Sequence, residues 1–146
     1  MKAEILSLLN LGSEESILFH KRLTLNIAFY KNNKRKIRKD MIITNHKLLF
    51  IDYLPWIFGP PKHIREIDVI PISEIISVVS EMRHIHLAKR PFFEITKRGC
   101  DTFGLAFSSF GNYGDEMKKI EDLLKLANSD IHITTNITQM PWKGFE

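Results

Sequence analysis

The chain has 146 residues and a mass of 17.0 kDa, and 44% of its residues are hydrophobic, which suits one ordinary domain. Charged residues make up 26%, close to the average for folded domains, so the composition excludes wholesale disorder. No apolar run approaches the roughly 18 residues that span a bilayer, and the start is a poor signal peptide. The single cysteine, Cys100, excludes an internal disulfide framework and favours a reducing, cytoplasmic compartment.

The positive charge is concentrated in one segment. The formal net charge is +4, from 21 Lys and Arg against 17 Asp and Glu. Six of the basic residues lie between Lys31 and Lys39 with no acid among them, so the rest of the chain holds more acidic than basic residues. Such a local excess predicts a surface for phosphate, nucleic acid or a membrane. The alternative is a solvated hairpin that only keeps the protein soluble.

The first half of the chain is predicted to contain a short helix and three strands. Residues 3–11 place three apolar side chains on one helical face. Residues 23–30 alternate apolar and polar side chains, which predicts a strand with one buried face. Turns are predicted at Asn32-Asn33 and at Thr44-Asn45-His46, and a Pro-rich and Gly-containing loop follows. The further strands are expected at residues 37–44 and 47–53, and the loop at 54–61.

The second half is predicted to hold four strands and then one helix. Met117, Ile120 and Leu124 belong to an apolar stripe of helical period, acids favour the start of this helix, and Asn128 is a suitable stop. Isoleucines after the helix indicate a further, weak strand. The four strands are expected at residues 65–70, 75–82, 92–97 and 102–107. About seven short strands followed by one amphipathic helix predict two antiparallel sheets, or a nearly closed barrel, plugged by the helix.

Several segments resemble pleckstrin-homology-like domains. Residues 39–51, KDMIITNHKLLFI, are similar to the second hairpin of that fold, and residues 70–78, IPISEIISV, resemble the start of its fifth strand. Residues 93–97 and the predicted helix fit its closing part. Three branches compete: the GRAM domain, bacterial pleckstrin-homology-like domains, and the tail homology domain of class I myosins. The basic first hairpin slightly favours the myosin tail.

The resemblance implies a mainly β fold, a partly open barrel of two near-orthogonal sheets capped by the helix, and binding instead of catalysis. The domain would span residues 15–128, after a helical segment at 1–14 and before an extension at 129–146. In lipid-binding members, a lysine ending the first strand and a basic-x-Arg pair in the second hold inositol phosphates. The matching positions here are Lys31 and the Lys36-Ile37-Arg38 stretch, to which Lys34 and Arg35 of the same basic hairpin are added.

Two other segments are candidate contacts. The loop after the third predicted strand carries Trp56, Ile57 and Phe58, and in an antiparallel meander it lies at the same end as the basic hairpin. Aromatic tips beside cations are typical of a peripheral membrane footprint, although folding back as a lid on the core is the commoner fate. Lys97 and Arg98 form a turn that borders the ligand rim in the family, but such a turn is usually just solvated.

No motif for catalysis or metal binding stands out. His84 and His86 would share a strand face, but zinc needs further ligands. Neither a phosphate-cradling glycine loop nor a nucleophile elbow is present. We therefore expect no enzyme, cofactor or metal. The first hypothesis is a module that binds anionic phospholipids, including phosphoinositides, at a membrane. The second is a protein-interaction scaffold of the same fold. Nucleic-acid binding ranks last, because aromatic residues do not interleave with the cations.

Overall fold

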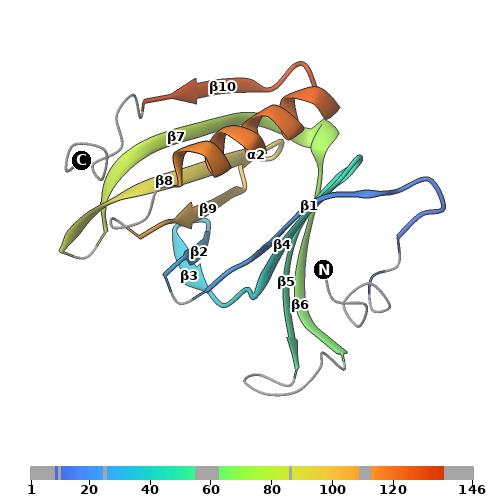
Figure 1. Cartoon of the computed structure of the whole chain (residues 1–146), viewed down its shortest axis with the longest axis horizontal. Coiled ribbons are helices and arrows are strands. Elements are labelled where there is room, and N and C mark those ends of the chain that lie inside the picture. The colour runs from blue at the N-terminus through green and yellow to red at the C-terminus, as the bar shows by residue number, and fades with distance from the viewer. Residues whose placement is uncertain are drawn as a thin grey trace.

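Two β-sheets and one long helix make up the fold (Figure 1). The computed structural model describes residues 9, 11–24, 26–54, 63–85, 87–108 and 113–136. In these residues the chain forms, in order, β1 (Ile17–Arg22), β2 (Ala28–Lys31), β3 (Lys34–Lys36), β4 (Asp40–Thr44), β5 (Lys47–Leu54), β6 (His63–Pro71), the 3-10 helix η1 (Ile72–Glu74), β7 (Ile75–Ile85), β8 (Ala88–Lys97), β9 (Thr102–Ala106), α2 (Gly114–Ala127) and β10 (His132–Thr135).

One sheet has four strands in the order β1-β4-β5-β6, and the other has six in the order β10-β7-β8-β9-β2-β3. All neighbouring strands are antiparallel except β10, which pairs parallel with β7. Figure 1 shows the two sets of strands crossing at a steep angle, with α2 lying over the six-stranded sheet. The predicted class, mainly β with a C-terminal helix, is confirmed, and β10 corresponds to the weak strand expected after the helix.

The first hairpin belongs to both sheets, which the sequence pattern did not indicate. The strand predicted at residues 23–30 is formed only from Ala28 on, as β2, because the residues before it make the bend from β1, which ends at Arg22 in the other sheet. A turn closes the gap, in which the Ile27 amide donates to the Thr24 carbonyl at 3.0 Å. The strand predicted at residues 37–44 is shorter, because residues 37–39 form the bend between β3 and β4 and only Asp40–Thr44 is a strand. Through the second bend burial does not alternate, since Ile37 is exposed and every residue of β4 is buried.

The core lies between the sheets and beneath α2. The ring of Phe29 on β2 packs against Phe50 on β5 with centroids 4.5 Å apart, so the core joins the two sheets directly. Met117, Ile120 and Leu124, the predicted stripe of α2, are buried in the same cluster. Burying a large apolar side chain contributes about 1.5–3 kcal/mol, so this stripe holds the helix in place. The helix ends at Ala127, one residue before the predicted stop.

The sheets do not close into a barrel. Strands β3 and β6 are edges of different sheets, and no ladder joins them among the described residues. The gap is crossed by side chains: Arg38, from the link between β3 and β4, reaches Asp68 on β6. The open corner therefore lies where the basic hairpin bends from one sheet to the other.

Candidate functional site

Strand β3 presents a row of cations at the edge of the six-stranded sheet. Lys34, Arg35 and Lys36 are all exposed, and no described residue forms an ion pair or hydrogen bond with their side chains. The turn before them, Asn32-Asn33, has φ angles of 51° and 66°, values that asparagine tolerates better than most residues. The predicted turn is thus confirmed. It pairs β3 with β2 in a register that leaves the outer edge of β3 free of a strand among the described residues.

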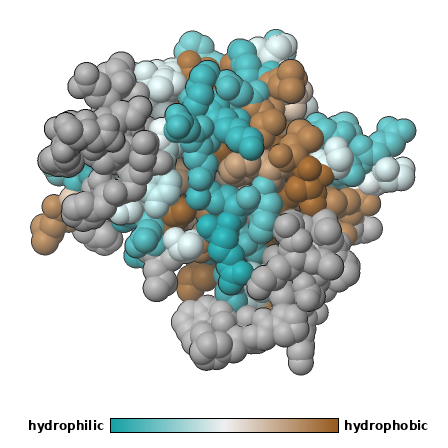
Figure 2. Space-filling model, in the orientation of Figure 1, coloured by the Kyte–Doolittle hydropathy of each residue, from teal (hydrophilic) through white to brown (hydrophobic). Residues whose placement is uncertain are grey.

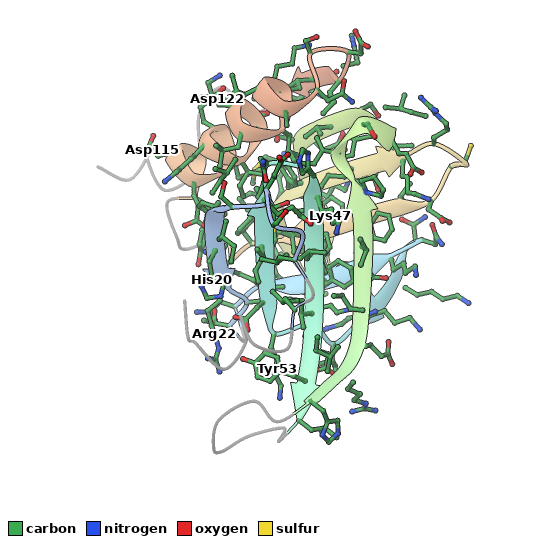
Figure 3. All side chains as sticks on the ribbon, turned by 90° about the vertical axis from the view of Figure 1, so that its right-hand side faces the viewer. His20, Arg22, Lys47, Tyr53, Asp115 and Asp122 are labelled. Carbon is green, nitrogen blue, oxygen red and sulfur yellow. The ribbon has the colours of Figure 1, made fainter. Side chains whose placement is uncertain are left out.

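The described surface around this strand is open to solvent. Figure 3 shows nitrogen-tipped side chains projecting outward from the light-blue β2–β3 ribbon, away from the sheets. Because the side chains of a strand alternate, Lys34 and Lys36 lie on one face and Arg35 on the other. An anionic surface that approaches this edge can therefore reach cations on both faces of the strand.

Two other cations of the hairpin turn inward and are already paired. Arg38 Nε lies 2.8 Å from Asp68 Oδ2, and Lys31 Nζ lies 3.0 Å from Asp68 Oδ1, so one carboxylate holds both. Arg38 Nη2 also lies 3.2 Å from Glu66. The Arg38 side chain is only 5% exposed and its guanidinium stacks over the Phe29 ring at 5.3 Å. The Asp68 carboxylate thus lies between Lys31 and Arg38, where the resemblance predicted a phosphate.

The predicted trio of Lys31, Lys36 and Arg38 is therefore divided. Lys36 is exposed at the end of β3, whereas Lys31 and Arg38 converge on Asp68. Lys36 and Arg38 are two residues apart in the sequence, but β3 ends at Lys36 and the chain bends immediately after it. The role of Lys31 and Arg38 as anion ligands stays a prediction, and it requires that a ligand compete with Asp68.

Lys39 is the last residue of the basic stretch, and its side chain packs against Tyr53 on β5. Its ammonium group donates to the Tyr53 carbonyl at 2.7 Å and lies 4.7 Å from the centre of the Tyr53 ring. Burial of the ammonium group lowers the pKa of Lys39, with nearby Asp52 opposing the shift. These contacts fix Lys39 against β5, on a different side of the bend from Lys36.

An open groove lies beside the cationic strand. Its volume is about 390 Å³, and its lining contains four cations and two carboxylates. The Arg65 guanidinium is half exposed and lies 4.0 Å from Asp52, a carboxylate that is almost fully buried. The net charge of the residues that line the groove is therefore positive, even after the carboxylates among them are counted. The lining residues are Arg35, Lys36, Ile37, Arg38, Asp52, Arg65 and Glu66.

From the sequence we did not identify Arg65, or the acids Asp52, Glu66 and Asp68, as residues of this site. The alternation of Glu66 and Asp68 in the predicted strand at 65–70 places both on one face, and it was a usable indication of carboxylates facing the groove. Which cations they would meet depends on the approach of β6 to the bend of the hairpin. That approach is a tertiary contact over 30 residues of sequence, as in the bond from Arg38 to Asp68.

The second predicted cationic turn lies next to the first. Asn32 donates to Asp101 at 3.2 Å, so the β2–β3 turn touches the β8–β9 turn that contains Lys97 and Arg98. Lys97 lies 3.6 Å from Glu74, whereas the Arg98 side chain is exposed and has no partner among the described residues. Arg98 is thus the more available of the two. The predicted tip of Trp56, Ile57 and Phe58 lies outside the described residues.

The described residues contain no group of three or more His, Cys, Asp or Glu that could hold a metal ion. His84 is exposed, and its predicted companion His86 lies outside the described residues. The exposed Cys100 sits in a turn with φ of 72°. Among the helices that the structure describes, none has the length and apolar character to cross a membrane.

Comparisons with known proteins identify the fold. No protein-family model and no curated protein matches the sequence. Among solved structures, the chain is similar to the Vps36 N-terminal PH domain, with a TM-score of 0.55 at 12% identity over 82% of this chain and 86% of that one. It is also similar to the hSac2 domain from human phosphoinositide phosphatase Sac2, with a TM-score of 0.57 at 11% identity over 88% and 82%. Identities this low establish a shared fold and nothing beyond it.

Proposed function

We propose that this chain, whose fold is pleckstrin-homology-like, is a non-enzymatic module that binds anionic phospholipid headgroups at the surface of a membrane. The observation that supports the proposal is strand β3, where Lys34, Arg35 and Lys36 are exposed on a sheet edge and have no counterion among the described residues. Three adjacent cations repel one another, so the arrangement favours a negatively charged partner. Such a module would associate peripherally with a cytoplasmic membrane face.

The energetics suit a reversible, salt-sensitive attachment. Each Lys or Arg near an anionic leaflet contributes about 1 kcal/mol, and the attraction falls off within a Debye length of about 10 Å. Arg65 and Arg98 are the other exposed cations near the β2–β3 ribbon and add to the same field. Lys31, Arg38 and Lys97 are paired with carboxylates and contribute less. Trp56, Ile57 and Phe58 remain a proposed apolar contact of the same surface.

The test is co-sedimentation with vesicles of phosphatidylcholine alone and of phosphatidylcholine with phosphatidylserine in a four-to-one ratio. The wild type should pellet only with the anionic vesicles. Lys34→Glu/Lys36→Glu should lower the partition coefficient at least about tenfold. Both lysines are exposed, so this pair preserves the fold better than a substitution of buried Arg38 would.

The matched control is Lys118→Glu/Lys119→Glu on α2, which changes the net charge equally at a distant exposed surface. Equal losses in the two double variants would show that net charge alone drives binding and would contradict a site on β3. A further vesicle set, with a phosphoinositide replacing phosphatidylserine at equal surface charge, tests headgroup selectivity. Calorimetry with a soluble inositol phosphate separates headgroup recognition from attraction to a bilayer.

The alternative function, a protein-interaction scaffold, is favoured by a different edge. On β6, Ile67 and Val69 are 39% and 47% exposed, and this strand is an edge of the four-stranded sheet. An extended peptide can add to such an edge and use alternate side chains for specificity. A partner pull-down that is lost on Val69→Lys, because an edge lysine opposes strand addition, and unchanged in Lys34→Glu/Lys36→Glu would favour the scaffold.

A further inference from the structure

The β7–β8 hairpin extends beyond the sheet as a narrow ribbon. The two strands pair out to Ile85 opposite Ala88, but the neighbouring strand β9 pairs with β8 only as far as Phe92. On the other side, β10 accompanies β7 no further than Ser80. Residues 83–85 and 88–90 are thus flanked by no other strand among the described residues. Figure 1 shows this hairpin as the element that reaches furthest to the lower left.

The tip of the ribbon is apolar and completely exposed. Leu87 has a relative exposure of 103%, the largest among the exposed large apolar side chains of the described residues, and the adjacent Ala88 is also exposed. Figure 2 shows apolar surface at the left-hand extremity, where Figure 1 places the end of this hairpin. Ile85, by contrast, packs inward on the small cluster of Ala28, Phe92 and Ala106. Leu87 therefore contributes nothing to the core.

The surroundings of the tip are cationic. Residues 82–93 contain no acid, whereas the same stretch holds three Arg or Lys residues and two histidines. His84 and Lys89 are direct cross-strand partners next to the tip, and both are exposed. Lys89 is therefore an exposed, charged side chain next to Leu87, with the polar His84 opposite it.

Two arginines hold the base of the ribbon. Arg83 lies 2.9 Å from Glu81 and 3.2 Å from Glu94, and its guanidinium stacks 4.2 Å from the centre of the Phe92 ring. Arg90 donates to three backbone carbonyls, those of Phe107, Ala106 and Asn26, at 2.8 to 3.0 Å. Because both guanidinium groups are engaged, the tip is presented on a fixed support, and Lys89 and His84 are the basic side chains left to meet a ligand.

We propose that Leu87 at the β7–β8 tip inserts into the interface of an anionic bilayer while Lys89 and His84 contact the headgroups. This inference rests on the membrane function proposed above and adds the element that enters the lipid. A single leucine on a two-stranded ribbon presents far less area than the roughly 1,200 Å² of even a small stable protein interface. A bilayer interface sets no such minimum, because binding strength there scales with the buried apolar area plus the attraction of nearby cations to anionic lipid.

The register places the cationic strand level with the middle of β8, and its β2–β3 turn lies at the end of the six-stranded sheet opposite this tip. Lys36 lies opposite Phe29, which aligns through Leu105 with Phe93 on β8. Phe93 is six residues beyond Leu87, about 20 Å along an extended strand, and Lys34 is level with Ile95, further still from the tip. The two surfaces are therefore separate sets of side chains on different strands, and each can be removed independently.

The first experiment compares Leu87→Asp with Leu126→Asp, using the phosphatidylcholine and phosphatidylserine vesicles described above. Leu126 is the matched control, because it is 83% exposed on α2 and far from the ribbon in the sequence. Leu87→Asp should lower the partition coefficient at least about tenfold, and Leu126→Asp less than about twofold. Neither side chain is buried, so the thermal melting curves of both variants should match the wild type.

The second experiment reports insertion directly. In a Cys100→Ser background, Leu87→Cys and Leu126→Cys each carry a polarity-sensitive fluorophore. Anionic vesicles should raise the emission and shift it to the blue at position 87 and leave it unchanged at position 126. The inference is overturned if the fluorescence at position 87 does not change although the wild type pellets with anionic vesicles and Lys34→Glu/Lys36→Glu does not. That outcome leaves the proposed function standing. Wild type that binds no vesicle overturns both.

Discussion

Arg38 and Asp68 form an ion pair that spans the corner where the two sheets separate, with Arg38 Nε 2.8 Å from Asp68 Oδ2 and each side chain only 5% exposed. The first residue lies in the bend of the basic hairpin and the second on the β6 edge. Lys31 shares the same carboxylate at 3.0 Å. The contact takes the place of a strand ladder, and it also decides which cations of the hairpin remain available to a ligand.

Removing the carboxylate should destabilise the protein. Asp68→Asn leaves the Arg38 guanidinium buried with only the half-exposed Glu66 as a counterion. Breaking a buried pair from one side costs about 3 kcal/mol or more, and we expect the free energy of unfolding in urea to fall by about this amount. Glu66→Gln is the control and should cost less than about 1 kcal/mol, because that carboxylate is 53% exposed. Equal costs would contradict a dominant role for Asp68.

The same substitution should strengthen binding to anionic vesicles. Asp68 neutralises Lys31, whose side chain is 38% exposed, so Asp68→Asn frees a cation at the open corner. We expect a gain of about fivefold in the partition coefficient below the melting temperature, since a cation near the surface contributes about 1 kcal/mol. Asp122→Asn on α2 removes one negative charge elsewhere and should give a smaller gain (Figure 3). A matching gain in the control would assign the effect to net charge.

Glu15 should make stability depend on acid pH. The Lys47 ammonium group at 2.9 Å, and hydrogen bonds from the Gly12 amide and the Thr44 hydroxyl, outweigh burial and lower the pKa of Glu15 from 4.5 to about 2. Figure 3 labels Lys47 at the start of β5. Because the pKa in the folded state is below that in the unfolded state, the contribution is full above pH 4.5 and is lost as the pH falls toward 2.

The check is urea unfolding of Glu15→Gln across that pH range. Lys47 is 35% exposed, so we expect the ionised pair to contribute about 2 kcal/mol, less than the full pKa difference implies. The variant should be less stable than wild type at neutral pH and approach it as the pH falls toward 2, since Glu15 of the wild type then becomes protonated. A constant difference between the two proteins over the whole range would exclude this ionisation as the cause.

Gly104 should tolerate no side chain. A Cβ at this position on β9 would lie 2.4 Å from the Phe92 ring, which also stacks with Arg83. We expect Gly104→Ala to cost about 1–3 kcal/mol of stability, as overpacking of a core does, and to lower the melting temperature. Gly12→Ala is the control, since its Cβ would meet Glu15 at an ordinary 3.6 Å. Recovery in Gly104→Ala/Phe92→Leu would locate the clash, whereas unchanged melting of the single variant would refute it.

Much of the fold follows from local patterns. The stripe of α2 requires only that apolar side chains share a face, and periodicity records this directly. The Asn32-Asn33 turn follows from backbone preference. The division of the first hairpin between two sheets was not predicted, because the hydrogen bonds of a strand that bends change partners only in three dimensions.

The sequence alone determined that this is a mainly β chain with a closing helix and a cationic first hairpin, because composition and periodicity depend on neighbours along the chain. Only the tertiary structure decided which cations face a ligand. Lys36 and Arg38 are two residues apart, yet one is exposed and the other is buried against Asp68, 30 residues further on. The strength of an ion pair depends on distance and burial, which are set by how β6 meets the bend and not by the order of residues.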